Sequence, residues 1–337
     1  MKKQLKSVAI FLSVLMLVGS LFGCASNTST ANSGKSGGKA GDKVTVGIIQ
    51  FTAHVALDSA REGFIAALQD NNFVEGQNLE IDFQNAQADQ SNLSTISDRF
   101  VSNKVDLVLA IATPAAQAIA GKTKDIPILG TAITDYEGAK LVDSNEKPGG
   151  NVTGTSDMNP IKEQIDLLVK LVPDAKTVGV LYTSNEDNSI IQARIAKEAI
   201  ENLGLNYVEV TVTNSNDVQQ AAQTIVEKCD AIYVPTDNVF ASSMPIVHGV
   251  TIASKTPVIA GESGMVENGA LATLGINYYD LGYQTGLMAI DVLTGKSKPA
   301  DMPIKTSEKF DFMINGTVAE EIGLAIPDDL KEFVITK

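Results

Sequence analysis

Cysteine, histidine and tryptophan are scarce in this sequence, and acidic residues outnumber basic ones. Its 337 residues include two cysteines, two histidines and no tryptophan, with 26 Lys+Arg against 40 Asp+Glu. Two cysteines cannot build a disulfide-rich scaffold or a four-cysteine zinc site, and two histidines leave little for a histidine-based metal site or a catalytic triad. A formal net charge of −14 argues against nucleic acid as a partner, because phosphate binding needs clustered cations.

Catalytic motifs are missing as well. The zinc-protease pattern H-E-x-x-H, the nucleotide-binding loop G-x-x-x-x-G-K-[ST] and the dinucleotide fingerprint G-x-G-x-x-G do not occur. Only carboxylate chemistry is left, and no pair of acids stands out. The sequence therefore predicts a protein that is not an enzyme.

The N-terminus has the pattern of an export signal. Lys2, Lys3 and Lys6 precede an almost unbroken apolar run over residues 8–22, which suits a secretory signal peptide and is short for a membrane span. We predict a signal peptide over residues 1–23. An N-terminal anchor helix is the alternative.

The apolar run ends in Leu-Phe-Gly-Cys, which resembles a bacterial lipobox, although Phe22 stands where a small residue is usual. We therefore predict that Cys24 carries lipid and anchors the chain to the outer face of the cell membrane, the alternative being a plain secretory signal. Residues 25–43 contain no large apolar side chain and cannot bury a core. Residues 24–43 are thus interpreted as a lipidated cysteine with a flexible tether.

From residue 44 onward, strand-like and helix-like patterns alternate. Apolar runs at residues 44–51, 79–86, 105–112 and 127–133 are separated by segments whose apolar residues recur every three or four positions. After a polar stretch at residues 143–150 the alternation restarts. Such βα repeats predict parallel sheets covered by helices.

Two such halves predict an α/β fold of two Rossmann-like lobes, each with a parallel sheet, joined by a hinge. We assign residues 44–153 plus about 277–303 to lobe 1, and residues 154–276 plus about 304–337 to lobe 2. Open parallel sheets bind ligands beyond the carboxyl ends of their strands. Two facing lobes therefore predict a ligand site in the cleft between them, closed by hinge motion.

Five runs, spread over about residues 44–325, resemble the substrate-binding lipoproteins of ABC importers, in particular the tryptophan/tyrosine-type group with the type I periplasmic-binding fold. They occur in the order VGIIQFTAHVALDSAREGF, VLAIATPAAQAIA, GGNVTGTSD, IYVPTDN and ALATLGINYYDLGYQTG.

The resemblance implies a monomeric, extracytoplasmic protein without cofactor or metal. It would deliver a free aromatic amino acid (tyrosine, tryptophan or phenylalanine) to a membrane permease and its ATPase. A same-fold binder of a sugar, a nucleoside or a branched amino acid is the alternative, as is a surface lipoprotein that also acts as an adhesin.

The turn after residues 105–112 is the candidate site for the ligand carboxylate. Thr113 is predicted as helix N-cap and Pro114 as the first helical residue. The N–H groups of Ala115 and Ala116 would then face an anion at the helix start. An ordinary capped helix explains the same residues.

The end of the next strand is a second candidate. Thr134 would donate its hydroxyl to the ligand carboxylate, and the carbonyl of Ala132 would accept from the amine. The alternative is a polar turn.

Other candidates follow strands of the second half or the crossing between the halves. Asp237, followed by Asn238, is expected to pair with the ligand ammonium across the cleft, or to be the N-cap of the next helix. Ser156 and Asp157, just past the crossing, and Glu262, after a later strand, either line the cleft or cap helices.

The pocket for the ligand side chain is expected near Phe51 and His54, where an aromatic ring would stack. Phe51 is equally well explained as core, and His54 as a helix start. Asn185 and Ser189, after a strand of the second lobe, are candidate partners for a phenol or an indole N–H.

Overall fold

The computed structural model describes residues 43–336. The predicted signal peptide, the lipid site Cys24 and nearly all of the tether lie outside the described residues, so these predictions are not tested here. Within the described range, no helix is both long enough and apolar enough to cross a membrane.

The first sheet has six strands in the order β11-β5-β4-β3-β1-β2, in which every neighbouring pair is parallel. Its strands are β1 (Val44–Gln50), β2 (Leu79–Asn85), β3 (Leu107–Ile111), β4 (Ile128–Ile133), β5 (Val152–Ser156) and β11 (Lys305–Thr306). The helices beside this sheet are α1 (Val55–Asp70), α2 (Gln90–Asn103), α3 (Thr113–Ala120) and α10 (Tyr278–Leu293). The predicted βαβαβαβ order is confirmed.

The second sheet has seven strands in the order β13-β12-β10-β9-β8-β6-β7. They are β6 (Thr177–Thr183), β7 (Asn206–Val212), β8 (Ala231–Val234), β9 (Val258–Ala260), β10 (Ala272–Gly275), β12 (Asp311–Asn315) and β13 (Val334–Ile335). Only the β10–β12 pair is antiparallel. Its helices are α4 (Ile161–Leu171), α5 (Asp187–Asn202), α6 (Val218–Val226), α7 (Asn238–Ser242), α8 (Met244–Ser254), α9 (Ser263–Glu267) and α11 (Gly316–Ile322). Two parallel α/β sheets in series are the predicted fold class.

The chain passes between the two sheets at three places. It leaves the first sheet after β5, returns before α10, and leaves again after β11. Strand β5 has the sequence VTGTS, whose low apolar content hides it from a hydrophobic pattern. Because β5 and β11 belong to the first sheet, we place the outward crossings after Ser156 and Thr306, a few residues beyond the expected positions.

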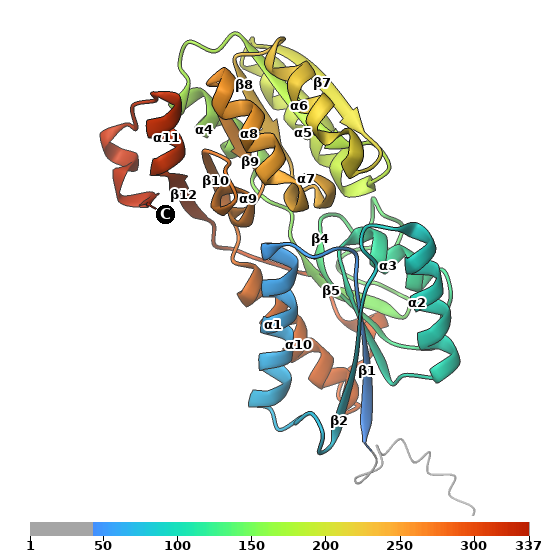
Figure 1. The fold of residues 1–337 in the computed structure, drawn as a ribbon. Helices are drawn as coiled ribbons and strands as arrows, with labels where there is room; N and C mark the ends of the chain where they lie inside the picture. Colours follow the sequence, from blue (N-terminus) through green and yellow to red (C-terminus); the bar gives the residue numbers. More distant parts are fainter. Residues whose placement is uncertain (1–42, 337) are drawn as a thin grey trace, which may run out of the picture. The chain divides into compact units, whose positions relative to one another are not determined.

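Helices α1 and α10 pack face to face through glycine, as Figure 1 shows for the two helices beside the first sheet. A Cβ on Gly282 would lie 1.8 Å from the carbonyl oxygen of Ala60, and one on Gly63 would lie 2.0 Å from that of Tyr279. Only glycine, which has no Cβ, fits at these two positions. This close contact fixes the start of α10, and with it Tyr278, relative to α1.

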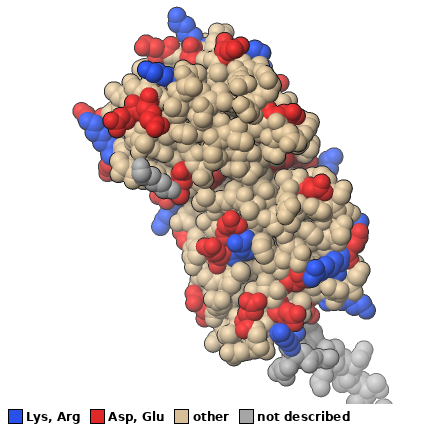
Figure 2. Space-filling model, in the orientation of Figure 1, with Lys and Arg blue, Asp and Glu red and all other residues tan. Residues whose placement is uncertain are grey.

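The strand ends place polar residues at one edge of each sheet. The turns after β1, β4 and β5 carry His54, Thr134 and Asp157, while those after β8 and β9 carry Asp237 and Glu262. Elsewhere, on the face that Figure 2 shows, Lys and Arg side chains lie among Asp and Glu and do not gather into a cationic patch.

Candidate ligand-binding site

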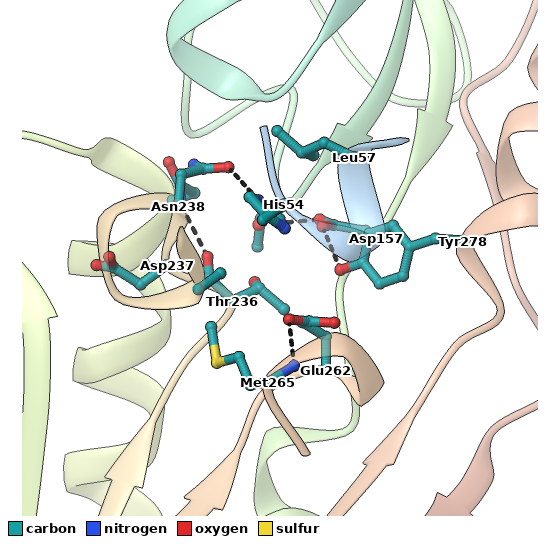
Figure 3. A pocket seen from close by; sticks show the side chains of 13 residues that line it. His54, Leu57, Asp157, Thr236, Asp237, Asn238, Glu262, Met265 and Tyr278 are labelled. Atoms are coloured by element: carbon teal, nitrogen blue, oxygen red, sulfur yellow. Dashed lines mark hydrogen bonds between the residues drawn. The ribbon is translucent and has the colours of Figure 1, made fainter. Parts of the chain in front are cut away.

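A cavity is bounded by strand ends of both sheets. It is lined by His54, Leu57, Ala132, Thr134, Asp157, Asn188, Thr236, Asp237, Asn238, Ala241, Glu262, Met265 and Tyr278 (Figure 3). Three of these carry carboxyl groups, and none of the lining residues is Lys or Arg. The cavity therefore favours a ligand with a positive charge.

Two alanines beside the cavity hold unusual backbone conformations. Ala112, after β3, has φ 83°, and Ala132, at the end of β4, has φ 55°. A left-handed conformation is costly for residues other than glycine and is concentrated at functional turns. The β4–β5 register shifts between Gly130 and Ile133, around Ala132. Both neighbouring strands thus end in turns that redirect the backbone at the edge of the cavity.

Asp157 is a buried carboxyl group held by two hydroxyl groups. Thr134 Oγ1 donates to its Oδ1 at 3.0 Å, and the Tyr278 hydroxyl donates to its Oδ2 at 2.9 Å. Burial raises the pKa of Asp157, while these hydrogen bonds lower it in part. A carboxylate has about four acceptor positions, so Asp157 can still accept hydrogen bonds from a ligand.

Asp237 has more protein partners. It is the N-cap of α7, accepting from the Phe240 N–H at 2.9 Å, and it accepts from the N–H and the hydroxyl of Thr183 at 2.6 and 2.8 Å. Burial raises its pKa. Most of its acceptor capacity is therefore used by the fold.

Glu262 lines the cavity as the N-cap of α9. Its carboxylate accepts from the N–H groups of Gly264 and Met265. Burial raises the pKa of Glu262 to about 7, against the lowering effect of these two hydrogen bonds. The residue caps a helix and faces the cavity at once.

Behind the cavity lies Glu186, which the sequence analysis did not select. Its side-chain oxygen Oε2 accepts from the amide groups of Asn238 and Asn188. Burial first, and then the negative charge of Asp237, raises the pKa of Glu186 to about 8. A buried carboxyl group with a raised pKa therefore stands behind two amides that line the cavity.

Unpaired polar atoms gather at this site. Among the described residues, six buried side-chain nitrogen or oxygen atoms have no hydrogen-bond partner. Four of them belong to His54, Glu186, Asn188 and Thr236, which line the cavity or lie directly behind it. Buried polar groups are almost always paired, so this cluster of unpaired atoms distinguishes the cavity from the rest of the described residues.

The cavity brings together half of the residues that the sequence predicts for the site. These are His54, Ala132, Thr134, Asp157, Asp237, Asn238 and Glu262. The predicted residues that do not line it are Phe51, Thr113, Ala115, Ala116, Ser156, Asn185 and Ser189.

The predicted residues that do not line the cavity have other positions in the fold. Phe51 lies in the core of the first sheet, Ser156 donates to the carbonyl of Thr134 at 2.8 Å, and Asn185 is exposed. Ser189 is fully buried and hydrogen-bonds to Asp237.

The expectation that Thr113 caps α3 is wrong. The N-cap is Ala112, and no side chain caps this helix. The left-handed conformation of Ala112 turns the chain one residue earlier than a Thr-Pro start suggests. The N–H of Ala116 already donates to the Ala112 carbonyl at 3.1 Å. Among the described residues, the N–H groups of Thr113 and Ala115 have no such acceptor.

The sequence analysis missed six lining residues: Leu57, Asn188, Thr236, Ala241, Met265 and Tyr278. For two of these residues, helical spacing was the sequence pattern that could have identified them. Leu57 and Ala241 follow His54 and Asn238 by three positions, which places each pair on one helix face.

Comparison with known proteins agrees with this architecture. The chain is 44% identical over 317 residues to a tyrosine-binding protein of Clostridioides difficile, which covers 94% of this chain and 91% of the relative. A Streptococcus pneumoniae ABC domain in complex with L-Trp matches with a TM-score of 0.84 and 41% identity, over 87% of this chain and all of that one.

A ligand-free, open substrate-binding protein with adhesive properties from Clostridium difficile matches with a TM-score of 0.67 and 46% identity, over 87% of this chain and 99% of that one. A solute-binding protein of Bacillus halodurans shares the fold at 14% identity, with a TM-score of 0.61. These relatives confirm the predicted type I periplasmic-binding fold.

Residues 45–334, nearly the whole described range, match the protein family described as "ABC transporter substrate binding protein". Members of this family bind solutes outside the cytoplasm and are not enzymes. This chain belongs to the ABC transporter substrate-binding protein family.

Proposed function

We propose that this protein captures a free aromatic amino acid in its cavity and delivers it to the permease and ATPase of an ABC importer. The observation that carries the proposal is the cavity itself, which combines buried carboxylates without Lys or Arg with the apolar side chains of Leu57, Ala241 and Met265. Relatives named for tyrosine binding and solved with L-Trp support it.

Asp157 is the proposed partner of the ligand ammonium. It is buried, its two protein partners are hydroxyl donors, and its remaining acceptor positions are free for N–H groups. Asn188 Oδ1 supplies a further unpaired acceptor at the cavity wall. An ammonium group has three donors and so satisfies both. Asp237, expected from the sequence to fill this role, is instead occupied by Thr183 and Phe240.

The ligand carboxylate is proposed to bind at the start of α3. A helix start favours anions, because its first N–H groups lack intrahelical acceptors. Here the available donors are the N–H groups of Thr113 and Ala115, whereas the Thr134 hydroxyl already donates to Asp157. The N–H of Ala116 is excluded because Ala112 already accepts from it.

A thermal-shift series with the twenty amino acids and a set of sugars and nucleosides tests this function. A ligand at 100 times its Kd stabilises the native state by about 2.7 kcal/mol, so we expect a clear rise in Tm with tyrosine, tryptophan or phenylalanine. A rise with a sugar or a nucleoside and none with any aromatic amino acid would reject the proposal.

We further propose that Cys24 carries the lipid that holds the protein at the membrane surface, on the sequence pattern alone. More than one acyl chain is enough for stable anchoring. Labelling cells with a fatty-acid analogue should tag the wild-type protein and leave Cys24→Ser unlabelled and released. A labelled Cys24→Ser protein contradicts the anchor.

Adhesion is a second candidate function, favoured by the 46%-identical relative described as a substrate-binding protein with adhesive properties. Attachment of cells that express the wild-type protein, compared with cells that lack it, is the test. Equal attachment would remove this candidate and leave the transport function untouched.

A further inference from the structure

The orientation of the Asn238 side chain is fixed by hydrogen bonds. Its amide nitrogen Nδ2 donates to Glu186 Oε2, and its backbone N–H donates to the same oxygen at 3.4 Å. The amide nitrogen of Asn238, and not its oxygen, thus faces the Glu186 carboxyl group. Asn238 Oδ1 is therefore directed toward His54, whose Nε2 lies 3.4 Å away.

This contact defines which nitrogen of His54 carries the hydrogen. An amide oxygen can only accept, so Nε2 must be the donor. Burial lowers the pKa of His54 to about 4, which leaves the imidazole neutral near pH 7 with a single N–H. Nδ1 is then a lone-pair acceptor. It is buried, and no group among the described residues donates to it.

Two apolar residues that line the cavity lie close in sequence to His54 and Asn238. Leu57 lies one turn beyond His54 on α1, and Ala241 lies one turn beyond Asn238 on α7. Residues three apart share a helix face, so the His54–Asn238 pair has an apolar neighbour on each helix. In the view of Figure 3, Asn238 and Asp157 lie on opposite sides of His54. An aromatic ring fits the apolar surroundings, and a donor at its edge would meet Nδ1.

We propose that His54 is the specificity-determining residue of the cavity, whose Nδ1 accepts a hydrogen bond from the phenol of tyrosine or the indole N–H of tryptophan. Phenylalanine offers no donor and leaves the acceptor unpaired. The proposal rests on the proposed function, that the ligand is an aromatic amino acid. It replaces the ring stacking expected for His54 from the sequence with a directional hydrogen bond.

Calorimetric affinities for tyrosine, tryptophan and phenylalanine, measured with the wild-type protein and with His54→Leu, test this role. The wild-type protein should bind tyrosine and tryptophan about 10- to 100-fold more tightly than phenylalanine. In His54→Leu, the affinities for tyrosine and tryptophan should fall to the level of the affinity for phenylalanine, so that the selectivity ratio is lost. The matched control is His248→Leu, at the other histidine of the chain, which should keep the wild-type ratios.

Three results would overturn the proposal. Equal wild-type affinities for tyrosine and phenylalanine would show that the protein does not select between them. An unchanged ratio of these two affinities in His54→Leu would show that another residue determines the selectivity. An equal loss for all three ligands would mean that Nδ1 meets the ammonium group instead of the ring. If the wild-type protein bound none of the three, the proposed function itself would fail.

Nitrogen-15 NMR of the wild-type protein tests the same point without a substitution. Because the chain has only two histidines, their ring nitrogens are readily assigned. The ligand-free protein should show His54 protonated on Nε2, and adding tyrosine, but not phenylalanine, should shift its Nδ1 resonance. A His54 protonated on Nδ1, or equal shifts with both ligands, contradicts the proposal.

Discussion

Tyr278 donates its hydroxyl to Asp157 at 2.9 Å and so joins two of the segments that connect the sheets. Asp157 directly follows β5, where the chain first leaves the first sheet, and Tyr278 begins α10, where it returns. The two residues are 121 positions apart in the sequence. Asp157, the proposed partner of the ligand ammonium, is therefore held at two of the three crossings between the sheets. This places the ligand charge at the junction of the two sheets.

Asp157→Asn should abolish tight binding and leave the fold intact. The amide keeps the size of the side chain, and the hydroxyl groups of Thr134 and Tyr278 can turn to suit it, but the negative charge opposite the ligand ammonium is lost. Removing one partner of a buried ion pair costs about 3–5 kcal/mol, which is a loss of 100-fold or more in affinity. Calorimetry measures this loss, with the exposed Asp166→Asn as control. Unchanged affinity would exclude Asp157 from ammonium binding.

Asp237→Ala should instead destabilise the protein. It removes the N-cap of α7 and leaves the N–H and hydroxyl of Thr183 without their acceptor. These losses sum to about 2–4 kcal/mol of unfolding free energy, which denaturant unfolding measures. If the variant kept its stability and lost ligand affinity as Asp157→Asn is expected to, the ammonium would belong to Asp237, as the sequence suggested.

The ligand-free protein should lose stability as the pH rises from 6.5 to 8.5. Glu262 and Glu186 have pKa values raised to about 7 and about 8 by burial. The native state thus holds protons that the unfolded state, with ordinary glutamate pKa values, has released. Stability then falls with rising pH, by about 2 kcal/mol over this window. The pKa of His54, lowered to about 4, has the opposite effect, because stability then rises with pH. This effect is confined to pH values below 6.5.

Thermal melts over this pH range, compared between wild type and Glu186→Gln, measure the effect. The amide imitates the protonated carboxyl group, so the variant should melt higher at pH 8.5 and show a flatter pH profile. Glu198→Gln, an exposed position on the same helix α5, is the control and should follow the wild type. A wild-type protein that becomes more stable between pH 6.5 and 8.5 would refute the assignment.

Gly282→Ala should destabilise the contact between α1 and α10. The added methyl group would lie 1.8 Å from the Ala60 carbonyl oxygen, so the helices must separate, at a cost of about 1–3 kcal/mol. Thermal unfolding should show a lower Tm. Gly249→Ala, on α8, meets no atom within 4 Å and should be neutral or slightly stabilising. Equal Tm values for the two variants would show that α1 and α10 are free to separate.

The local pattern of the sequence was sufficient for the fold class. Buried strands such as Leu107–Ile111 are apolar at every position, and the helices between them repeat apolar residues every three or four positions. Local chemistry also marked several strand ends, because polar residues such as Thr134 and Asp237 follow the apolar runs at Ile128–Ile133 and Ala231–Val234. Strands with few apolar residues, such as Val152–Ser156, were missed because no periodicity distinguishes them from a turn.

The sequence by itself determined the family fold, the polar strand ends and half of the residues around the cavity. Only the tertiary structure decided which acids are used up by the fold and which still face the cavity. Asp237 and Asp157 both lie in turns that follow strands, and their local sequence does not separate their roles. They differ because Thr183 and Phe240 donate to one, whereas two hydroxyl groups hold the other. Apart from Phe240, these partners come from segments 23 to 121 positions away, which only the folded structure brings together.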